Sequence, residues 1–146
     1  MVQMSKDTEH ALISNILVAV DGSETSSKAA EMAIDLAEKH RADLIVLFVV
    51  APKANFSEVF YLSKENGQKI VDEVKNKALA KKLKANTEVL FDVGSVPKAI
   101  VEYAENNNAN LIVIGTRGIS GIKRMLVGST ASEVVKYSHC PIIVVK

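Results

Sequence analysis

Leu111-Ile-Val-Ile114-Gly115-Thr-Arg-Gly118-Ile-Ser-Gly-Ile-Lys-Arg-Met-Leu-Val-Gly128-Ser129-Thr130 is the stretch that decides the fold class of this chain. A continuous apolar run opens it, a glycine-punctuated loop follows, and the helix-like Ala131-Ser-Glu-Val-Val-Lys136 comes next. Such a run is typical of a strand covered on both faces in a parallel sheet. Glycines present backbone N–H groups without a Cβ in the way, and the start of a helix favours anions. The stretch therefore predicts a strand, loop and helix that bind phosphate.

The glycine spacing separates this loop from two common nucleotide motifs. Two residues lie between Gly115 and Gly118, nine lie between Gly118 and Gly128, and hydroxyl side chains follow at once. No Gly-Lys-Ser/Thr closes the loop as in a Walker A motif, and no G-x-G-x-x-G opens it as in a dinucleotide fingerprint. A second interpretation of Thr130-Ala-Ser-Glu133 is a capping box that stabilises a helix start without a ligand. The two interpretations are compatible.

Outward from this unit, apolar runs alternate with helical patterns. The candidate strands are 16–20, 44–50, 89–91, 111–114 and 142–145. Helices are expected from Ser23 or Ser26, around 70–78, from near Ser95, and from Gly128 to Thr130 onward. Residues 51–66 are expected to form a long connection and a candidate lid. The alternation predicts an open parallel sheet with helices on both faces.

Composition limits the class of protein. At 146 residues the chain matches one domain, and Lys plus Arg (18) nearly balance Asp plus Glu (17). A formal charge of +1 favours neither a nucleic acid nor an acidic membrane as partner. The single cysteine cannot form an internal disulfide, no leader pattern opens the chain, and no apolar run approaches the ~20 residues of a membrane helix. We expect a cytoplasmic protein with a flexible tail (1–13) and one domain (14–146).

These motifs resemble the universal stress protein family, in its ATP-binding branch. The resemblance rests on Asn15-Ile-Leu-Val-Ala-Val-Asp21-Gly-Ser23 at the first strand and on G-x2-G-x9-G-Ser/Thr after the fourth, and it spans about residues 14–146. It implies a single-domain, five-stranded parallel sheet in the order 3-2-1-4-5, similar to the adenine nucleotide alpha-hydrolase and Rossmann-like folds. Ligands of such sheets bind where the winding direction reverses, here between strands 1 and 4.

The residues and the resemblance together predict a site for ATP or AMP with Mg²⁺. Backbone N–H groups along the glycine loop and the helix start would hold phosphates, and the hydroxyls after Gly128 would add hydrogen bonds or approach the metal ion. The whole predicted set is Asp21, Gly22, Ser23, Val49, Gly115, Arg117, Gly118, Gly128, Ser129, Thr130 and Ser132.

Three members of this set have ordinary structural alternatives. By resemblance Asp21 meets the ribose or a metal-bound water; the alternative is an Asx-type turn leading into the first helix. Val49 would read the adenine edge through its backbone, or be a plain strand residue. Arg117 would offset phosphate charge, or be an exposed loop arginine.

Four functions are compatible with these residues to different degrees. The first is a nucleotide-binding regulatory protein of stress response, and the second is a slow ATPase or nucleotidyl-transfer enzyme using the same site. Glu24 and Glu133 lie near it, but neither is marked as a tuned base, so at most a weak ATPase is expected and no catalytic residue is assigned. A response-regulator-like phosphoacceptor at Asp92 would need an acidic pair at the end of strand 1, where Asp21 stands alone. A nucleotide-free dimeric interaction module is the fourth.

The last strand predicts how the protein associates. Residues 141–146 read Pro-Ile-Ile-Val-Val-Lys and would form an apolar sheet edge, which proteins cover or use. A homodimer through this strand is the prediction, and the family resemblance implies the same pairing. His139 and Cys140 are neighbours but lack the further ligands of a zinc site.

Overall fold

A five-stranded parallel sheet forms the centre of the molecule. The computed structural model describes residues 12–51, 57–116 and 127–146, with backbone only for 57–62. The strands are β1 (Asn15–Ala19), β2 (Asp43–Val49), β3 (Ala85–Leu90), β4 (Leu111–Gly115) and β5 (Ile142–Val145). The helices are α2 (Glu24–His40), α3 (Ser57–Ala80), α4 (Val96–Asn106) and α5 (Ser129–Tyr137). The sheet order is β3-β2-β1-β4-β5, and all its pairs are parallel, which confirms the predicted fold.

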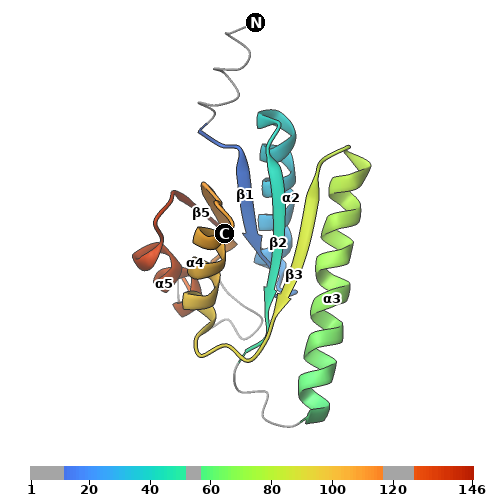
Figure 1. The fold of residues 1–146 in the computed structure, drawn as a ribbon, viewed down its shortest axis with the longest axis vertical. Coiled ribbons are helices and arrows are strands. Elements are labelled where there is room, and N and C mark those ends of the chain that lie inside the picture. Colours follow the sequence, from blue (N-terminus) through green and yellow to red (C-terminus); the bar gives the residue numbers. More distant parts are fainter. Residues whose placement is uncertain (1–11, 52–56, 117–126) are drawn as a thin grey trace, which may run out of the picture.

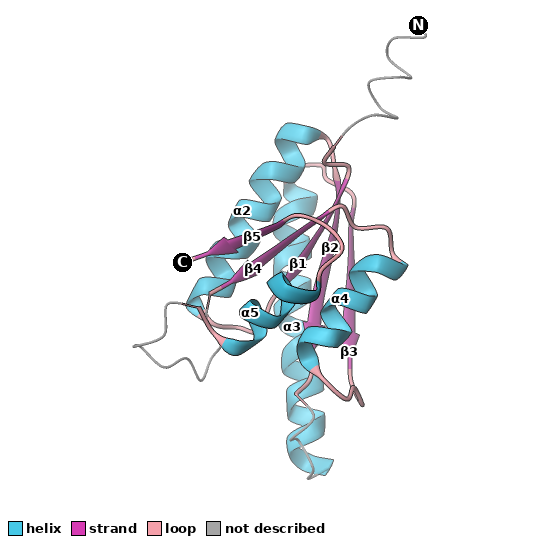
Figure 2. Ribbon diagram, turned by 90° about the vertical axis from the view of Figure 1, so that its left-hand side faces the viewer, coloured by secondary structure: helices cyan, strands magenta, loops and turns pink. Residues whose placement is uncertain are grey.

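The helices cover both faces of the sheet. α2 and α3 lie on one face and α4 and α5 on the other (Figures 1 and 2). Because successive strand side chains point to opposite faces, β1 supplies Ile16 and Val18 to the core under α2 and α3, and Leu17 to the core under α4 and α5. All three side chains have no exposed surface. Burial on both faces explains why this strand reads as a continuous apolar run.

Strand β3 differs from the strand expected at 89–91. It begins at Ala85 and ends at Leu90. Ala85 and Val89 are buried under α3, whereas Asn86 on the other face is exposed. β3 is an edge strand, and its second face is only partly covered, so it carries polar residues there. Because of these polar residues, most of the strand does not read as an apolar run.

The long connection expected at 51–66 is largely wrong. Helix α3 begins at Ser57, so residues 57–66 are helical and not a lid loop. No glycine or proline interrupts 57–66, and a helix can therefore extend back from the apolar face at Ile70. Residues 52–56 lie outside the described residues, as do residues 1–11 of the predicted tail. Ile13 packs partly against the core beneath α2.

Gly67 lets α3 approach the sheet closely. A Cβ placed on Gly67 would lie 2.5 Å from Cδ1 of Phe48 on β2 and 2.9 Å from its Cε1. Phe48 is buried among the side chains beneath α2 and α3, so its ring has little room to move. The glycine is therefore explained by helix–sheet packing, although glycine within a helix costs about 0.5–1 kcal/mol relative to alanine.

We expect Gly67→Ala to lower the free energy of unfolding by about 1–2 kcal/mol. Overpacking costs about 1–3 kcal/mol, and the better helix propensity of alanine offsets only part of it. Urea denaturation measures the change. Gly94→Ala is the matched control, because a Cβ there meets no atom within 4 Å, and it should change stability by less than about 0.5 kcal/mol. Equal stability of both variants would contradict the packing explanation.

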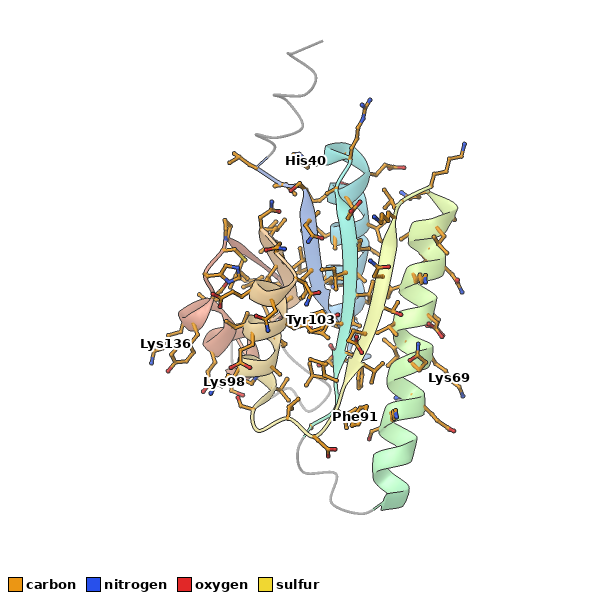
Figure 3. The ribbon with its side chains drawn as sticks, in the orientation of Figure 1. His40, Lys69, Phe91, Lys98, Tyr103 and Lys136 are labelled. Carbon is orange, nitrogen blue, oxygen red and sulfur yellow. The ribbon has the colours of Figure 1, made fainter. Side chains whose placement is uncertain are left out.

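Tyr103 connects α4 to the partly covered face of β3 (Figure 3). Its hydroxyl donates a hydrogen bond to Oε2 of Glu88 over 3.4 Å. Burial, then the negative charge of Glu88, and then this hydrogen bond raise the pKa of Tyr103 above its ordinary value of 10.0. The folded protein thus favours the neutral phenol.

The raised pKa predicts a loss of stability at high pH. Its contribution is fully present below about pH 10, the unfolded value, and is lost as pH rises through the folded pKa. Glu88→Gln removes the charge and keeps an acceptor, so the pKa of Tyr103 should fall but stay above its ordinary value, because burial is the largest cause. NMR ring resonances of the three tyrosines, labelled with a stable isotope and followed against pH, measure the pKa of Tyr103. An unchanged Tyr103 pKa would rule out the contribution of Glu88.

Candidate functional site

The two predicted site loops leave adjacent strands at the same edge of the sheet. β1 pairs with β4, and Ala19 lies opposite Ile114 in the register. Asp21 follows the end of β1 by two residues, and Thr116 directly follows β4. From β1 the chain adds β2 and then β3 on one side of the sheet, whereas β4 and β5 lie on the other side of β1. The winding direction therefore reverses between β1 and β4. Ligands of open α/β sheets bind beyond the carboxyl ends of strands at such a point.

The loop after β1 is a tight turn built around Asp21. Gly22 has a φ of 86°, a left-handed value that side chains other than glycine disfavour. The N–H of Ser23 donates to Oδ1 of Asp21 over 2.9 Å, which is the Asx-type turn considered as an alternative for this residue. Ser23 is the N-cap of α2, and its side chain accepts a hydrogen bond from the N–H of Ser26. Asp21 is half-buried and the turn uses one of its oxygens, so the turn and a ligand role remain compatible.

Ser26 stabilises this turn from beneath. Its hydroxyl accepts a hydrogen bond from the N–H of Asp21 over 3.3 Å and donates one to the carbonyl of Ser23 over 3.1 Å. Together with the bond from Ser23 N–H to Asp21, these contacts close a ring through three residues. Ser26 is 4% exposed, so it is part of the support of the loop rather than its surface.

Gly115 is a close-packing position at the end of β4. A Cβ on it would lie 2.6 Å from Oγ1 of Thr25, 2.7 Å from the carbonyl carbon of Thr25 and 2.8 Å from the backbone nitrogen of Ser26. The first turn of α2 therefore rests directly on the last residue of β4. This contact holds the α2 side of the site against the β4 side.

The glycine loop returns to the strand from which it starts. The N–H of Gly128 donates a hydrogen bond to the carbonyl of Thr116, and the N–H of Thr116 donates to the carbonyl of Val145 over 2.8 Å. The start of α5 is thereby fixed beside the end of β4. Arg117 and Gly118 of the predicted set lie outside the described residues.

Helix α5 begins without a side-chain cap. Its N-cap is Gly128, in an extended conformation, and glycine has no side chain to form the usual capping hydrogen bond. The alternative interpretation of residues 130–133 as a capping box is wrong, because Thr130 lies inside the helix, after Ser129, and not at the N-cap. The N–H groups of the first turn of a helix have no partner within the helix. This helix start therefore keeps the anion-binding capacity that a cap would use.

The remaining predicted residues lie around the same edge. Ser129 and Ser132 are exposed and Thr130 is half-buried, all in the first turns of α5. Val49 is half-buried and ends β2, the strand next to β1. The structure thus gathers Asp21, Gly22, Ser23, Val49, Gly115, Gly128, Ser129, Thr130 and Ser132 on the carboxyl edge of β2, β1 and β4.

The described residues give less support to a metal site made by side chains alone or to a membrane-spanning helix. No group of three or more His, Cys, Asp or Glu side chains there could hold a metal ion on its own. Cys140 is half-buried, and its backbone N–H donates to the Ser138 hydroxyl, while His139 is exposed. Helices in the described ranges also lack the combination of length and apolar character needed to cross a lipid bilayer.

Sequence reasoning missed two buried polar residues at the site, Ser26 and Thr116. The sequence predicts Ser26 only as an alternative N-cap, a position that Ser23 occupies. Thr116 is 1% exposed and links β4, β5 and Gly128 through its backbone. The partners of Ser26 lie within five residues of it in the chain, so only its burial depends on the fold. Thr116 has no sequence signal, because the sheet brings its partner Val145 to it.

Comparison with known proteins agrees with this arrangement. The sequence profile of the universal stress protein family matches residues 13–146. The chain belongs to this family. A universal stress protein of Methanocaldococcus jannaschii is 37% identical over 143 residues, which cover 92% of this chain and 83% of the relative.

Solved structures of the family share the fold. Universal stress protein UspA from Lactobacillus plantarum superposes with a TM-score of 0.78 at 28% identity, covering 91% of this chain and 97% of that one. A universal stress protein in complex with cAMP superposes with a TM-score of 0.70 at 26% identity, covering 91% of this chain and 96% of that one. One solved structure of this family is therefore a complex with an adenine nucleotide.

Proposed function

We propose that this universal stress protein binds ATP or AMP at the carboxyl edge between β1 and β4 and that the bound nucleotide regulates its interactions in a stress response. The observation that carries the proposal is the uncapped start of α5, fixed beside the end of β4 by the hydrogen bond from Gly128 to Thr116. The first N–H groups of a helix have no partner within the helix, and they favour phosphate. The cAMP complex of a structural neighbour adds independent support.

The phosphates would lie against the first turn of α5. Gly128 has no Cβ, so a phosphate can approach the backbone N–H groups of Ser129 and Thr130. The hydroxyls of Ser129, Thr130 and Ser132 supply further donors from the same turns. In this proposal Arg117 and Gly118 complete the phosphate loop.

The nucleoside would lie toward β1 and β2. Asp21 is the acceptor proposed for the ribose hydroxyls, with Gly22 and Ser23 shaping its loop, and the backbone at Val49 is proposed to read the adenine edge. Mg²⁺ is usually held by one or two carboxylates together with substrate phosphates. The donors on this edge fit that pattern through Asp21 and a bridging water, and the ion would neutralise phosphate charge.

A slow ATPase remains the second candidate function for the same edge. Glu133 lies in the second turn of α5 and is exposed, so in this proposal it is near the phosphates. ATP turnover that disappears in Asp21→Ala would favour the enzyme. Absence of any nucleotide affinity in a folded protein would favour a dimeric interaction module.

Calorimetry with ATP and AMP, with and without Mg²⁺, tests the proposal. We expect micromolar binding by the wild-type protein and its loss in Gly128→Val, because the added side chain would occupy the phosphate position. The φ of −69° at residue 128 is accessible to valine, so the variant should fold. No binding by well-folded wild-type protein would refute the nucleotide function.

We also propose a homodimer through residues 141–146. Strand β5 is at the edge of the sheet, and Ile142, Ile143 and Val144 are only half-buried. The carbonyl of Pro141 accepts a hydrogen bond from Ile112 of β4, and the carbonyl of Val145 accepts one from Thr116, which directly follows β4. By the two-residue period of a strand, the N–H and carbonyl of Val144 then point away from β4, toward a partner strand.

Sedimentation at micromolar concentration tests the dimer. Val144→Pro removes the outward N–H without removing a bond to β4, so it should yield monomer, whereas Val144→Ala keeps the donor and should remain dimeric. A monomeric wild-type protein would refute this interface.

A further inference from the structure

We infer that Ser26 is the positioning residue that holds Asp21 for the nucleoside half of the proposed site, an inference that rests on the nucleotide-binding function. Asp21 and Ser26 are joined by a hydrogen bond from the N–H of Asp21 to the Ser26 hydroxyl over 3.3 Å. The same hydroxyl donates to the carbonyl of Ser23 over 3.1 Å, and Ser23 N–H donates to Oδ1 of Asp21 over 2.9 Å. Ser26 thus affects the orientation of the Asp21 carboxylate in two ways, directly through the N–H of Asp21 and indirectly through Ser23.

The position requires a hydroxyl. One atom must accept from Asp21 and donate to Ser23 at the same time, and Ser or Thr can do both, whereas a carboxylate only accepts and an alkyl group does neither. At 4% exposure Ser26 has almost no surface for contact with a ligand. Its effect on binding therefore passes through Asp21.

Ser26 also lies where the two halves of the site touch. Its backbone nitrogen would be 2.8 Å from a Cβ on Gly115, so the end of β4 limits how closely this turn can approach the sheet. The Ser26 N–H donates to the Ser23 hydroxyl over 3.2 Å, which ties the N-cap to the same residue. Glycine at 115 and serine at 26 together set the distance between Asp21 and the strand that leads to the phosphate loop.

A purely structural role is the alternative. Serine near a helix start commonly forms local turns that stabilise the helix without any function. The two roles differ in which ligand they affect. Loss of a helix-start contact weakens the whole protein, whereas loss of a positioning residue weakens binding of the ligand part that Asp21 contacts.

The experiment compares AMP with inorganic tripolyphosphate in EDTA, so that no metal ion links Asp21 to phosphate. Ser26→Ala should lower AMP affinity about three- to ten-fold, the effect of a hydrogen bond or two, and leave tripolyphosphate affinity within about two-fold of wild type. Ser27→Ala is the matched control, because Ser27 is the exposed neighbour in the same helix turn. It should change neither affinity. Equal losses for both ligands in Ser26→Ala would overturn the positioning role.

A double-mutant cycle with Asp21→Ala tests the route. If Ser26 acts through Asp21, Ser26→Ala should change AMP affinity by less than about two-fold once Asp21 is alanine. A full additional loss would show a route independent of Asp21 and overturn the inference. If the wild-type protein binds AMP and Ser26→Ala binds it with the same affinity, the inference is overturned and the nucleotide function stands. If the wild-type protein binds no AMP, the nucleotide function itself is refuted.

Amide hydrogen exchange in the wild-type protein supplies a test that needs no variant to fold. The Asp21 N–H is held by Ser26, so it should exchange more slowly than the N–H of exposed Gly22. Equal rates at the two residues would show that the bond does not persist in solution and would overturn the inference.

Discussion

Replacing Gly128 with aspartate is expected to remove phosphate-dependent nucleotide binding while making the fold slightly more stable. Gly128 is an N-cap without a side-chain hydrogen bond, in the extended conformation that capping side chains adopt. An aspartate there would accept from the first-turn N–H groups of α5 and would favour the helix dipole. The gain over glycine should be a few tenths of a kcal/mol. The same carboxylate would occupy the proposed phosphate position.

The loss of affinity should be large because it combines occupation with repulsion. Two like charges about 4 Å apart near a protein surface repel by about 4 kcal/mol at low salt, so AMP affinity should fall by about 100-fold or more. Calorimetry and thermal unfolding measure the two opposite effects. Gly128→Asn has nearly the same shape without the charge and should lose less affinity. Adenosine, which lacks phosphate, should bind both variants as it binds wild type.

A result in which Gly128→Asp loses neither AMP nor tripolyphosphate affinity would show that the start of α5 does not hold phosphate. A result in which adenosine affinity falls equally would instead indicate a general disturbance of the site. The opposite signs of stability and binding distinguish a ligand position from a structural one, since structural damage lowers both.

Replacing Gly115 with alanine is expected to lower both stability and nucleotide affinity. The added Cβ would meet two backbone atoms, the carbonyl carbon of Thr25 and the nitrogen of Ser26, at 2.7 and 2.8 Å. Backbone contacts cannot be relieved by a change of rotamer, so the first turn of α2 must move away from β4. We expect a cost of about 3 kcal/mol, at the upper end for overpacking, which is a large part of the stability of an ordinary domain.

The shift of α2 would also carry the Asp21 loop away from the start of α5. AMP affinity should therefore fall by about ten-fold, corresponding to about 1.4 kcal/mol. Urea denaturation and calorimetry at a temperature where the variant is folded measure the two losses. Gly67→Ala is the informative comparison, because it should lower stability through Phe48 of β2, beneath α3, and reduce affinity less than Gly115→Ala does. Wild-type stability of Gly115→Ala would contradict the close contact between β4 and α2.

The glycine spacing in the sequence predicts the region of the site but not the structural role of each glycine. Gly115 was expected to belong to the ligand loop, and the structure gives it a packing contact with Thr25. Gly128 was expected to face phosphate, and the structure shows an uncapped helix start there. The spacing alone could not separate these roles, because one depends on a helix 90 residues earlier in the chain.

The sequence by itself determined the alternation of strands and helices and the family. Continuous apolar runs such as 111–114 mark strands buried on both faces, and the glycine spacing with Asp21-Gly22-Ser23 marks the family. Local patterns determine local structure because strand and helix periods depend on near neighbours in the chain.

Only the tertiary structure decided how residues far apart in sequence act together. It closed the loop from Thr116 to Gly128 and brought the first turn of α2, with Ser26, against Gly115. The contact between Ser26 and Gly115 depends on the pairing of β1 with β4, whose partners such as Ala19 and Ile114 are distant in the chain. A hydrogen bond or a close contact between such residues leaves no periodic signal in the sequence, because it forms only once the sheet has brought them together.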